Sequence, residues 1–116
     1  MAQLIRGDVW SVNFDPSVGA EIRKARPAVI ISDPNVGRLP LRIVVPISGW
    51  QQQFANYPWI VKLDATSTNG LKKTSGADAF AVKSISEKRF IQQLGRLTEA
   101  ELDEIAAAIA LCVGYK

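Results

Sequence analysis

Two residue types that carry much of enzyme chemistry are scarce in this sequence: its 116 residues include no histidine and only one cysteine. The absence of histidine excludes a histidine-based catalytic triad, a two-histidine nuclease and most zinc sites. A lone Cys112 can form neither an internal disulfide nor a multi-cysteine metal site, and its apolar neighbours predict a buried thiol without a chemical role. Any catalysis must therefore use Arg, Lys, Asp, Glu, Ser, Thr or Tyr, and we expect no metal and no cofactor.

Long apolar stretches are missing as well. The longest uninterrupted ones cover residues 27–31, 43–47 and 105–113, whereas a membrane-spanning helix needs about 20 apolar residues. Residues 1–8 have no basic-then-apolar signal-peptide pattern and lead directly into a strand-like segment. We therefore expect a cytoplasmic protein without a membrane segment, and the length predicts a single domain over residues 1–116.

The charge balance is mildly basic. A formal net charge of +3 permits a polyanionic partner but does not require one. The sequence shows no tight cluster of carboxylates of the kind that holds Mg²⁺. A nuclease built from these residues therefore has little means of activating an external water molecule.

Most of the chain has the pattern of β-strands. The alternation at 9–14 and the apolar runs at 27–32, 42–48, 57–63 and 77–85 predict strands, separated by turn signals such as Asn69-Gly70. Pro46 suggests an edge strand or a bulge. Many short strands with regular turns are typical of a small barrel or a sandwich.

The last part of the chain predicts a helix. Thr98-Glu99-Ala100-Glu101 has the pattern of a capping box. Apolar residues then recur every three or four positions, at Leu102, Ile105, Ala106, Ile109 and Val113, and Gly114 suits the C-terminal end. A shorter helical turn is expected to begin at Ser86. The expected architecture is mainly β, with a C-terminal α-helix and one short helix.

Four segments stand out together: Arg6-Gly7-Asp8-Val9-Trp10, a basic loop and strand over 21–30 that contains Arg26-Pro27, Val44-Val45-Pro46-Ile47-Ser48, and Leu94-Gly95-Arg96-Leu97. In this order and spacing they resemble the MazF/PemK toxin family over nearly the whole chain. The resemblance implies an SH3-like β-barrel fold.

It also implies a sequence-specific, metal-independent endoribonuclease, an mRNA interferase of a type II toxin–antitoxin system. Such an enzyme cleaves single-stranded mRNA by attack of the ribose 2′-hydroxyl, which leaves a 2′,3′-cyclic phosphate. The implied partners are a second copy in a homodimer and an antitoxin whose acidic C-terminal segment lies across the RNA groove. Free toxin is expected to arrest cell growth.

Arg26 is the first candidate catalytic residue. Pro27 restricts the residue before it to an extended conformation, so Arg26 is expected at the corner where the loop enters the strand. A guanidinium suits the stabilisation of a pentacovalent phosphorane. The alternative is a surface cation that neutralises Glu21 or Asp33; the resemblance, in which the matching Arg is catalytic, favours the functional interpretation.

Ser48 and Glu21 complete the predicted catalytic set. Ser48 ends an apolar strand and stands where the family more often has Thr; it keeps the hydroxyl but lacks the methyl group that restricts the rotamer. The alternative is an ordinary strand-end serine. Glu21 matches an acidic position in the family's loop and either accepts a proton from the 2′-hydroxyl or orients Arg26.

Four further residues are predicted to bind RNA. Arg23 and Lys24 give the loop positive charge for phosphate contacts, although a solvated charge run is an equal alternative. Trp50 is the candidate for base stacking, with a dimer-interface role as its alternative. Asp78 lies where the family carries a carboxylate near the groove. Ala81 replaces a frequent Gln there, which bears on the bases that are read.

Two other functions fit the same fold class. One is a non-catalytic toxin that acts by protein binding, as a gyrase poison does, and the other is a nucleic-acid-binding barrel. Neither needs the combination of Glu21, Arg26 and Ser48.

Overall fold

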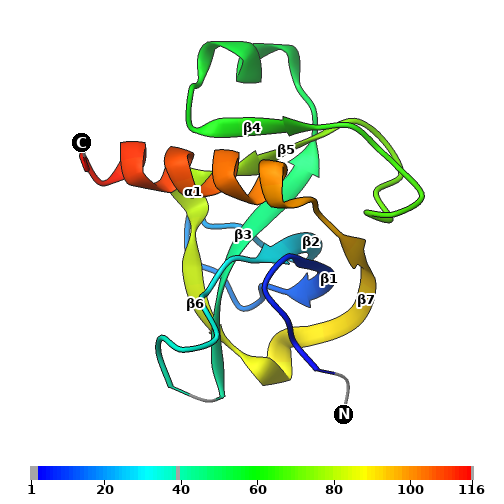
Figure 1. Cartoon of the computed structure of the whole chain (residues 1–116), viewed down its shortest axis with the longest axis vertical. Helices are drawn as coiled ribbons and strands as arrows, with labels where there is room; N and C mark the ends of the chain where they lie inside the picture. The colour runs from blue at the N-terminus through cyan, green and yellow to red at the C-terminus, as the bar shows by residue number, and fades with distance from the viewer. Residues whose placement is uncertain (1–2, 39, 116) are drawn as a thin grey trace.

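The computed structural model describes residues 3–38 and 40–115. Its elements in chain order are β1 (Asp8–Asn13), β2 (Ala25–Ile30), β3 (Leu41–Gly49), η1 (Gln52–Asn56), β4 (Ile60–Leu63), β5 (Ser75–Asp78), η2 (Ala79–Ala81), β6 (Lys83–Ser86), η3 (Glu87–Arg89), β7 (Phe90–Arg96) and α1 (Glu99–Cys112). The strands form one antiparallel sheet in the order β4-β5-β3-β2-β1-β7, and β6 pairs with β3 beside this path (Figure 1).

The first three predicted strands are confirmed, and both faces of this part of the sheet are buried. Successive residues of a strand point to opposite faces. Ala28 and Ile30 of β2 therefore join a core cluster with Trp10, whereas Val29 joins the cluster beneath α1. Burial on both faces explains why residues 27–31 form an unbroken apolar run.

Pro46 lies in neither an edge strand nor an ordinary bulge. On one side, β3 pairs with β2 through Ala28↔Pro46. On the other side, β3 pairs with β6 up to Val44 and with β5 from Ile47 onwards. Pro46, which has no backbone N–H to donate, stands where the partner strand of β3 on this side changes from β6 to β5.

Two predicted strands differ from those observed. Residues 57–63 form a strand only from Ile60, because η1 and the turn after it occupy the preceding residues. The predicted strand over 77–85 is interrupted by η2, since the Asp78 carboxylate accepts a hydrogen bond from the Phe80 N–H and caps that short helix. β7 was not expected from the sequence, because irregular pairing with β1 breaks its alternation.

The predicted helix is confirmed. In α1 the Thr98 hydroxyl accepts from the Glu101 N–H at 3.1 Å, and the Glu101 carboxylate accepts from the Thr98 N–H at 2.9 Å. Of the expected apolar face, Leu102 and Ile105 are buried, whereas Ala106 and Val113 are exposed. The short turn after Ser86 is present as η3.

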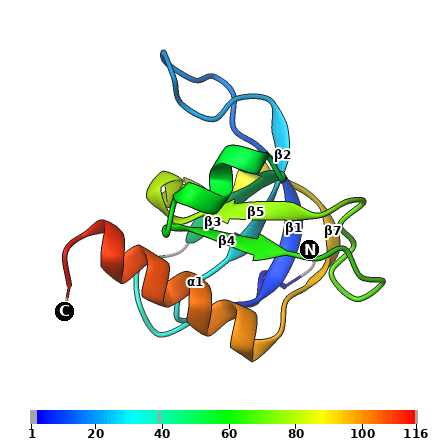
Figure 2. The same ribbon diagram turned by 90° about the horizontal axis from the view of Figure 1, so that it is seen from above.

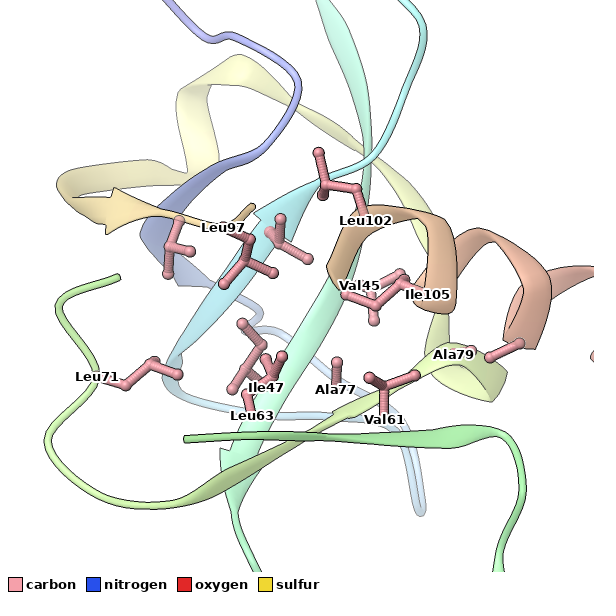
Figure 3. Packing of buried hydrophobic residues seen from close by; sticks show 13 residues of the cluster. Val45, Ile47, Val61, Leu63, Leu71, Ala77, Ala79, Leu97, Leu102 and Ile105 are labelled. Atoms are coloured by element: carbon pink, nitrogen blue, oxygen red, sulfur yellow. The ribbon is translucent and has the colours of Figure 1, made fainter. Parts of the chain in front are cut away.

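The main core lies between α1 and the sheet. Leu102 and Ile105 of α1 belong to one buried cluster with Val45 and Ile47 of β3 and Val61 of β4 (Figure 3). Each such side chain contributes about 1.5–3 kcal/mol when it leaves water. This packing holds the C-terminal half of β3 in place.

The expected fold class, an SH3-like antiparallel β fold with a C-terminal helix, is confirmed, but the sheet does not close by strand pairing. Within residues 3–38 and 40–115 the outer strands β4 and β7 are not partners. The segment between β4 and β5, residues 64–74, bridges the gap, and the Arg96 N–H of β7 donates to the Thr68 carbonyl at 3.0 Å. Gly70 and Gly95 allow this approach, because a Cβ at either would collide with the backbone of the other segment.

Candidate active site

Arg26 and Ser48 line the same groove. It has a volume of about 390 Å³ and crosses the sheet beside residues 70–75. The lining residues are Ser11, Ala25, Arg26, Pro27, Ile47, Ser48, Gly49, Gly70, Leu71, Lys72, Lys73, Ser75, Gln92 and Leu94. Ile47 and Leu71, both labelled in Figure 3, belong to the core as well, so the groove borders the packed interior.

The strand register explains why these two residues line the same groove. Ala28 of β2 is paired with Pro46 of β3, so continuing the same antiparallel register by two residues places Arg26 opposite Ser48. The alternation of strands also puts both on the same face. Pro27 and Pro46 lack backbone N–H groups, so the β2–β3 ladder is short of donors at this end. Pairing between β2 and β3 ends at Ala28↔Pro46, and the groove opens beyond this pair.

Arg26 differs in one detail from its expected position. Strand β2 begins at Ala25, so Arg26 lies inside the strand, opposite Val12 of β1, and not at a corner before it. Its Nε donates to the carbonyl of Arg23 at 3.4 Å. Neither Glu21 nor Asp33 forms an ion pair with Arg26 in the part of the chain that the structure describes, where the ion pairs are those of Arg6, Arg42 and Arg96.

The groove is cationic. Arg26, Lys72 and Lys73 line it, and its lining within the described ranges includes no Asp or Glu. A concave surface with charge of one sign concentrates the field and attracts ligands of the opposite sign. Phosphate groups are the ligands that such a groove favours.

The other predicted loop residues lie outside the groove. The loop between β1 and β2 projects from the body of the molecule (Figure 2) and carries Glu21, Arg23 and Lys24, all exposed. The Glu21 carboxylate accepts a hydrogen bond from the Val18 N–H at 2.7 Å, so its interaction is with the backbone of its own loop. Lys24 has a φ of 67°, a conformation uncommon for a residue with a side chain.

Trp50 follows β3 but does not line the groove. Its ring is half-buried and packs edge-to-face on Phe54, with ring centroids 5.5 Å apart. The Lys62 ammonium lies 5.3 Å from the centre of the Trp50 ring. The structure therefore places Trp50 on the η1 side of the β3 end.

Asp78 also lies outside the groove, at the far end of β5. Burial raises the pKa of its carboxyl, and hydrogen bonds from the backbone of Phe80 and Ala81 lower that pKa in part. Cys112 of α1 is half-buried, and its pKa is raised by burial and by the negative charge of Asp78. The raised pKa keeps this thiol protonated, as expected of a residue without a chemical role.

Sequence reasoning missed Lys72 and Lys73. The signal was present as two adjacent lysines before a strand, but nothing local shows that their loop folds back over the end of β3. The Lys73 side chain lies across Gly49: a Cβ on that glycine would stand 2.6 Å from Cε and 2.8 Å from Nζ of Lys73.

Known proteins resemble this chain over nearly its whole length. A family model described as PemK-like, MazF-like toxin of type II toxin-antitoxin system matches residues 5–113. The chain belongs to this toxin family. Among its MazF-like relatives, endoribonuclease MazF9 of Mycobacterium tuberculosis is 34% identical over 112 residues, which cover 91% of this chain and 92% of that protein. Endoribonuclease EndoA of Bacillus subtilis is 28% identical, with 91% and 90% covered.

Solved structures of MazF proteins share the fold. MazF from Deinococcus radiodurans superposes with a TM-score of 0.78 at 24% identity, covering 94% of each chain. An endoribonuclease in complex with its cognate antitoxin, from a mycobacterial species, gives a TM-score of 0.72 at 21% identity, covering 99% of this chain and 98% of that one. In residues 3–38 and 40–115 no helix is long and apolar enough to cross a membrane. Within these residues, no group of three or more His, Cys, Asp or Glu side chains is placed so that it could hold a metal ion.

Proposed function

We propose that this endoribonuclease toxin cleaves single-stranded mRNA at short sequences, without a metal, by attack of a ribose 2′-hydroxyl on the adjacent phosphorus. The observation that carries the proposal is that Arg26 and Ser48, near the ends of β2 and β3, line one cationic groove. The family match and the endoribonuclease relatives support RNA cleavage as the activity.

The reaction needs charge stabilisation more than it needs a strong base. As the P–O2′ bond forms and the P–O5′ bond breaks, negative charge accumulates on the non-bridging oxygens. Arg26 is permanently charged and can donate two parallel N–H bonds to that phosphorane. The Ser48 hydroxyl donates to a non-bridging oxygen from the facing strand. Because the attacking hydroxyl belongs to the substrate, the reaction is intramolecular and its rate gains from proximity. DNA lacks this hydroxyl and should not be cleaved.

The β1–β2 loop supplies the other predicted contacts. Arg23 and Lys24 are exposed there and free to bind phosphates that flank the cut, and Trp50 provides a ring near the end of β3 for base stacking. We propose that Glu21 accepts the 2′-hydroxyl proton or orients Arg26 once RNA draws this loop towards the groove, and that Asp78 takes part in reading bases.

The partners follow from the same surfaces. A toxin of this type has an antitoxin as partner, and we propose that an acidic C-terminal segment of the antitoxin occupies the cationic groove and excludes RNA. We also propose a homodimer. It is supported by an apolar hollow formed by Pro58, Trp59, Phe80, Leu111 and Cys112, in which the Phe80 residue is 74% exposed. Cleavage of mRNA places the toxin in the cytoplasm and stops growth.

The test is incubation of the purified protein with a long RNA in EDTA, followed by mapping of the ends. We expect cuts with 5′-hydroxyl and 2′,3′-cyclic phosphate ends. Arg26→Ala should lower the rate about 10²–10³-fold while circular dichroism shows a folded protein. Arg38→Ala, an exposed arginine outside the groove, is the matched control and should cleave as the wild type does.

Other outcomes would contradict the proposal. RNA left intact by the wild type, with gyrase trapped on DNA, would identify a poison that acts by protein binding. RNA bound but left intact would identify a nucleic-acid-binding barrel. Cleavage that persists unchanged in Arg26→Ala would remove Arg26 from the mechanism.

A further inference from the structure

The groove contains few groups that can release a proton. When the P–O5′ bond breaks, the departing oxygen takes an electron pair and needs a proton. Arg26 is a poor donor, because a guanidinium does not deprotonate in proteins. Ser11, Ser48, Ser75 and the Gln92 amide are weaker acids still, and the groove lining in the described ranges has no carboxyl group. The remaining proton donors are the ammonium groups of Lys72 and Lys73.

Of these two lysines, Lys73 is the one whose side chain lies over the end of β3. Its Cε and Nζ lie over Gly49, the residue directly after Ser48, and they occupy the space that any larger residue at 49 would fill. The backbone on either side is anchored: the buried Ser75 hydroxyl donates to the Lys73 carbonyl at 2.9 Å, and the Trp50 N–H donates to the Thr74 carbonyl at 3.0 Å.

We propose that Lys73 is the general acid of the cleavage reaction and that Gly49 is present to let its ammonium reach the leaving oxygen. This inference rests on the proposed ribonuclease function. It assigns the protonation of the leaving 5′-oxygen, for which Arg26 is a poor donor. The P–O2′ bond forms, the P–O5′ bond breaks, and the electron pair of the broken bond takes a proton from Nζ to give the 5′-hydroxyl. The proton of the 2′-hydroxyl leaves to solvent or to a base, and water reprotonates the lysine.

A substrate with a better leaving group tests this role. After the cut site has been mapped, a short RNA is made with sulfur in place of the bridging 5′-oxygen at that site, and single-turnover rates are measured. A thiolate leaves without protonation. We expect Lys73→Ala to slow the oxygen substrate about 10²-fold or more and to cleave the sulfur substrate at nearly the wild-type rate.

Three further variants separate proton transfer from binding. Lys73→Arg keeps the positive charge, but a guanidinium cannot give up a proton to the leaving oxygen. This variant should therefore bind RNA normally, cleave the oxygen substrate slowly and cleave the sulfur substrate well. Lys72→Ala should weaken RNA binding without a selective rescue by sulfur. Lys88→Ala, an exposed lysine outside the groove, is the matched control and should behave as the wild type.

Gly49→Ala provides an independent test. Its Cβ would collide only with the flexible end of Lys73 at under 3 Å, so the strand should stay folded while the ammonium is displaced. We expect this variant to lose rate on the oxygen substrate and to recover it on the sulfur substrate. In the Lys73→Ala background the same change should have no further effect, since both act through one group.

The outcomes distinguish the two levels of the proposal. If the wild type does not cleave RNA, the ribonuclease function itself fails. If the wild type cleaves and Lys73→Ala cleaves the oxygen substrate equally fast, or slows both substrates to the same extent, the general-acid role is overturned and the proposed function stands.

Discussion

Ser48 brings a hydroxyl to the groove from the end of β3, where it is half-buried and paired in register with Gly76 of β5. Threonine has the same hydroxyl, and its methyl group narrows the rotamers available. We predict that Ser48→Thr retains full cleavage activity, whereas Ser48→Ala lowers kcat about 10²-fold, as expected for the loss of one donor to the phosphorane. Equal rates for wild type and Ser48→Ala would remove this hydroxyl from the reaction.

Asp78 should make the stability of the protein depend on pH. Burial raises the pKa of its carboxyl in the folded state above the ordinary value of 3.8. The folded state therefore binds this proton more tightly than the unfolded state does, and the contribution of Asp78 to stability is present below pH 3.8 and is lost as pH rises through the raised value.

Asp78→Asn removes this titration and keeps an oxygen that can accept from the Phe80 N–H. Relative to the wild type, we predict that the variant gains stability between about pH 3 and pH 7, with the difference growing as pH rises. Urea unfolding followed by fluorescence at several pH values measures it. A difference that is constant over this range would show that the pKa of Asp78 is the same in the folded and unfolded states.

The residues of the site differ in how far the sequence predicts them. Arg26 and Ser48 were predicted mainly from the family resemblance, because position alone fits a surface cation and an ordinary strand-end serine equally well. The strand register that brings both to one groove is visible only in the structure. Lys73 could not be predicted, because its place over Gly49 depends on the fold of residues 64–74. Asp78 was predicted near the groove from resemblance alone, and the structure puts it at the end of β5 away from the groove lining.

Among the elements, α1 is the one whose beginning is most fully specified by local interactions. Thr98 and Glu101 satisfy each other's backbone N–H groups at its first turn. We predict that Thr98→Ala destabilises the protein by about 1 kcal/mol and that Thr98→Ser has little effect. Urea unfolding measures both, and the specific activity of folded Thr98→Ala should equal that of the wild type, because the cap lies outside the groove.

Elements held by distant contacts were harder to predict. The helix and the first three strands carry their own periodicity and end signals. By contrast, β7 has two register shifts against β1, and Gly95 sits in it because the backbone of Thr68 and Asn69 approaches there. In the sequence, a glycine is the only sign of such a close backbone approach, and a glycine alone predicts a turn as readily as a strand.

At the scale of the whole molecule, the apolar hollow beside the C-terminal end of α1 should hold a second copy. Leu111 is 52% exposed there, so a charge at this position should disturb an interface without unfolding the monomer. We predict that Leu111→Glu sediments as a monomer at concentrations where the wild type sediments as a dimer, and that Leu111→Met remains dimeric. A monomeric wild type, or a dimer unaffected by the charge, would contradict this use of the surface.

The bridge between residues 64–74 and β7 has a consequence for the synthesis of the toxin. The segment that carries the two lysines is bonded to β7 through the Arg96 N–H and the Thr68 carbonyl, and β7 follows Arg26, Ser48 and both lysines in the chain. On the ribosome, a chain that has not yet folded β7 against β1 therefore lacks this support for the two lysines of the groove.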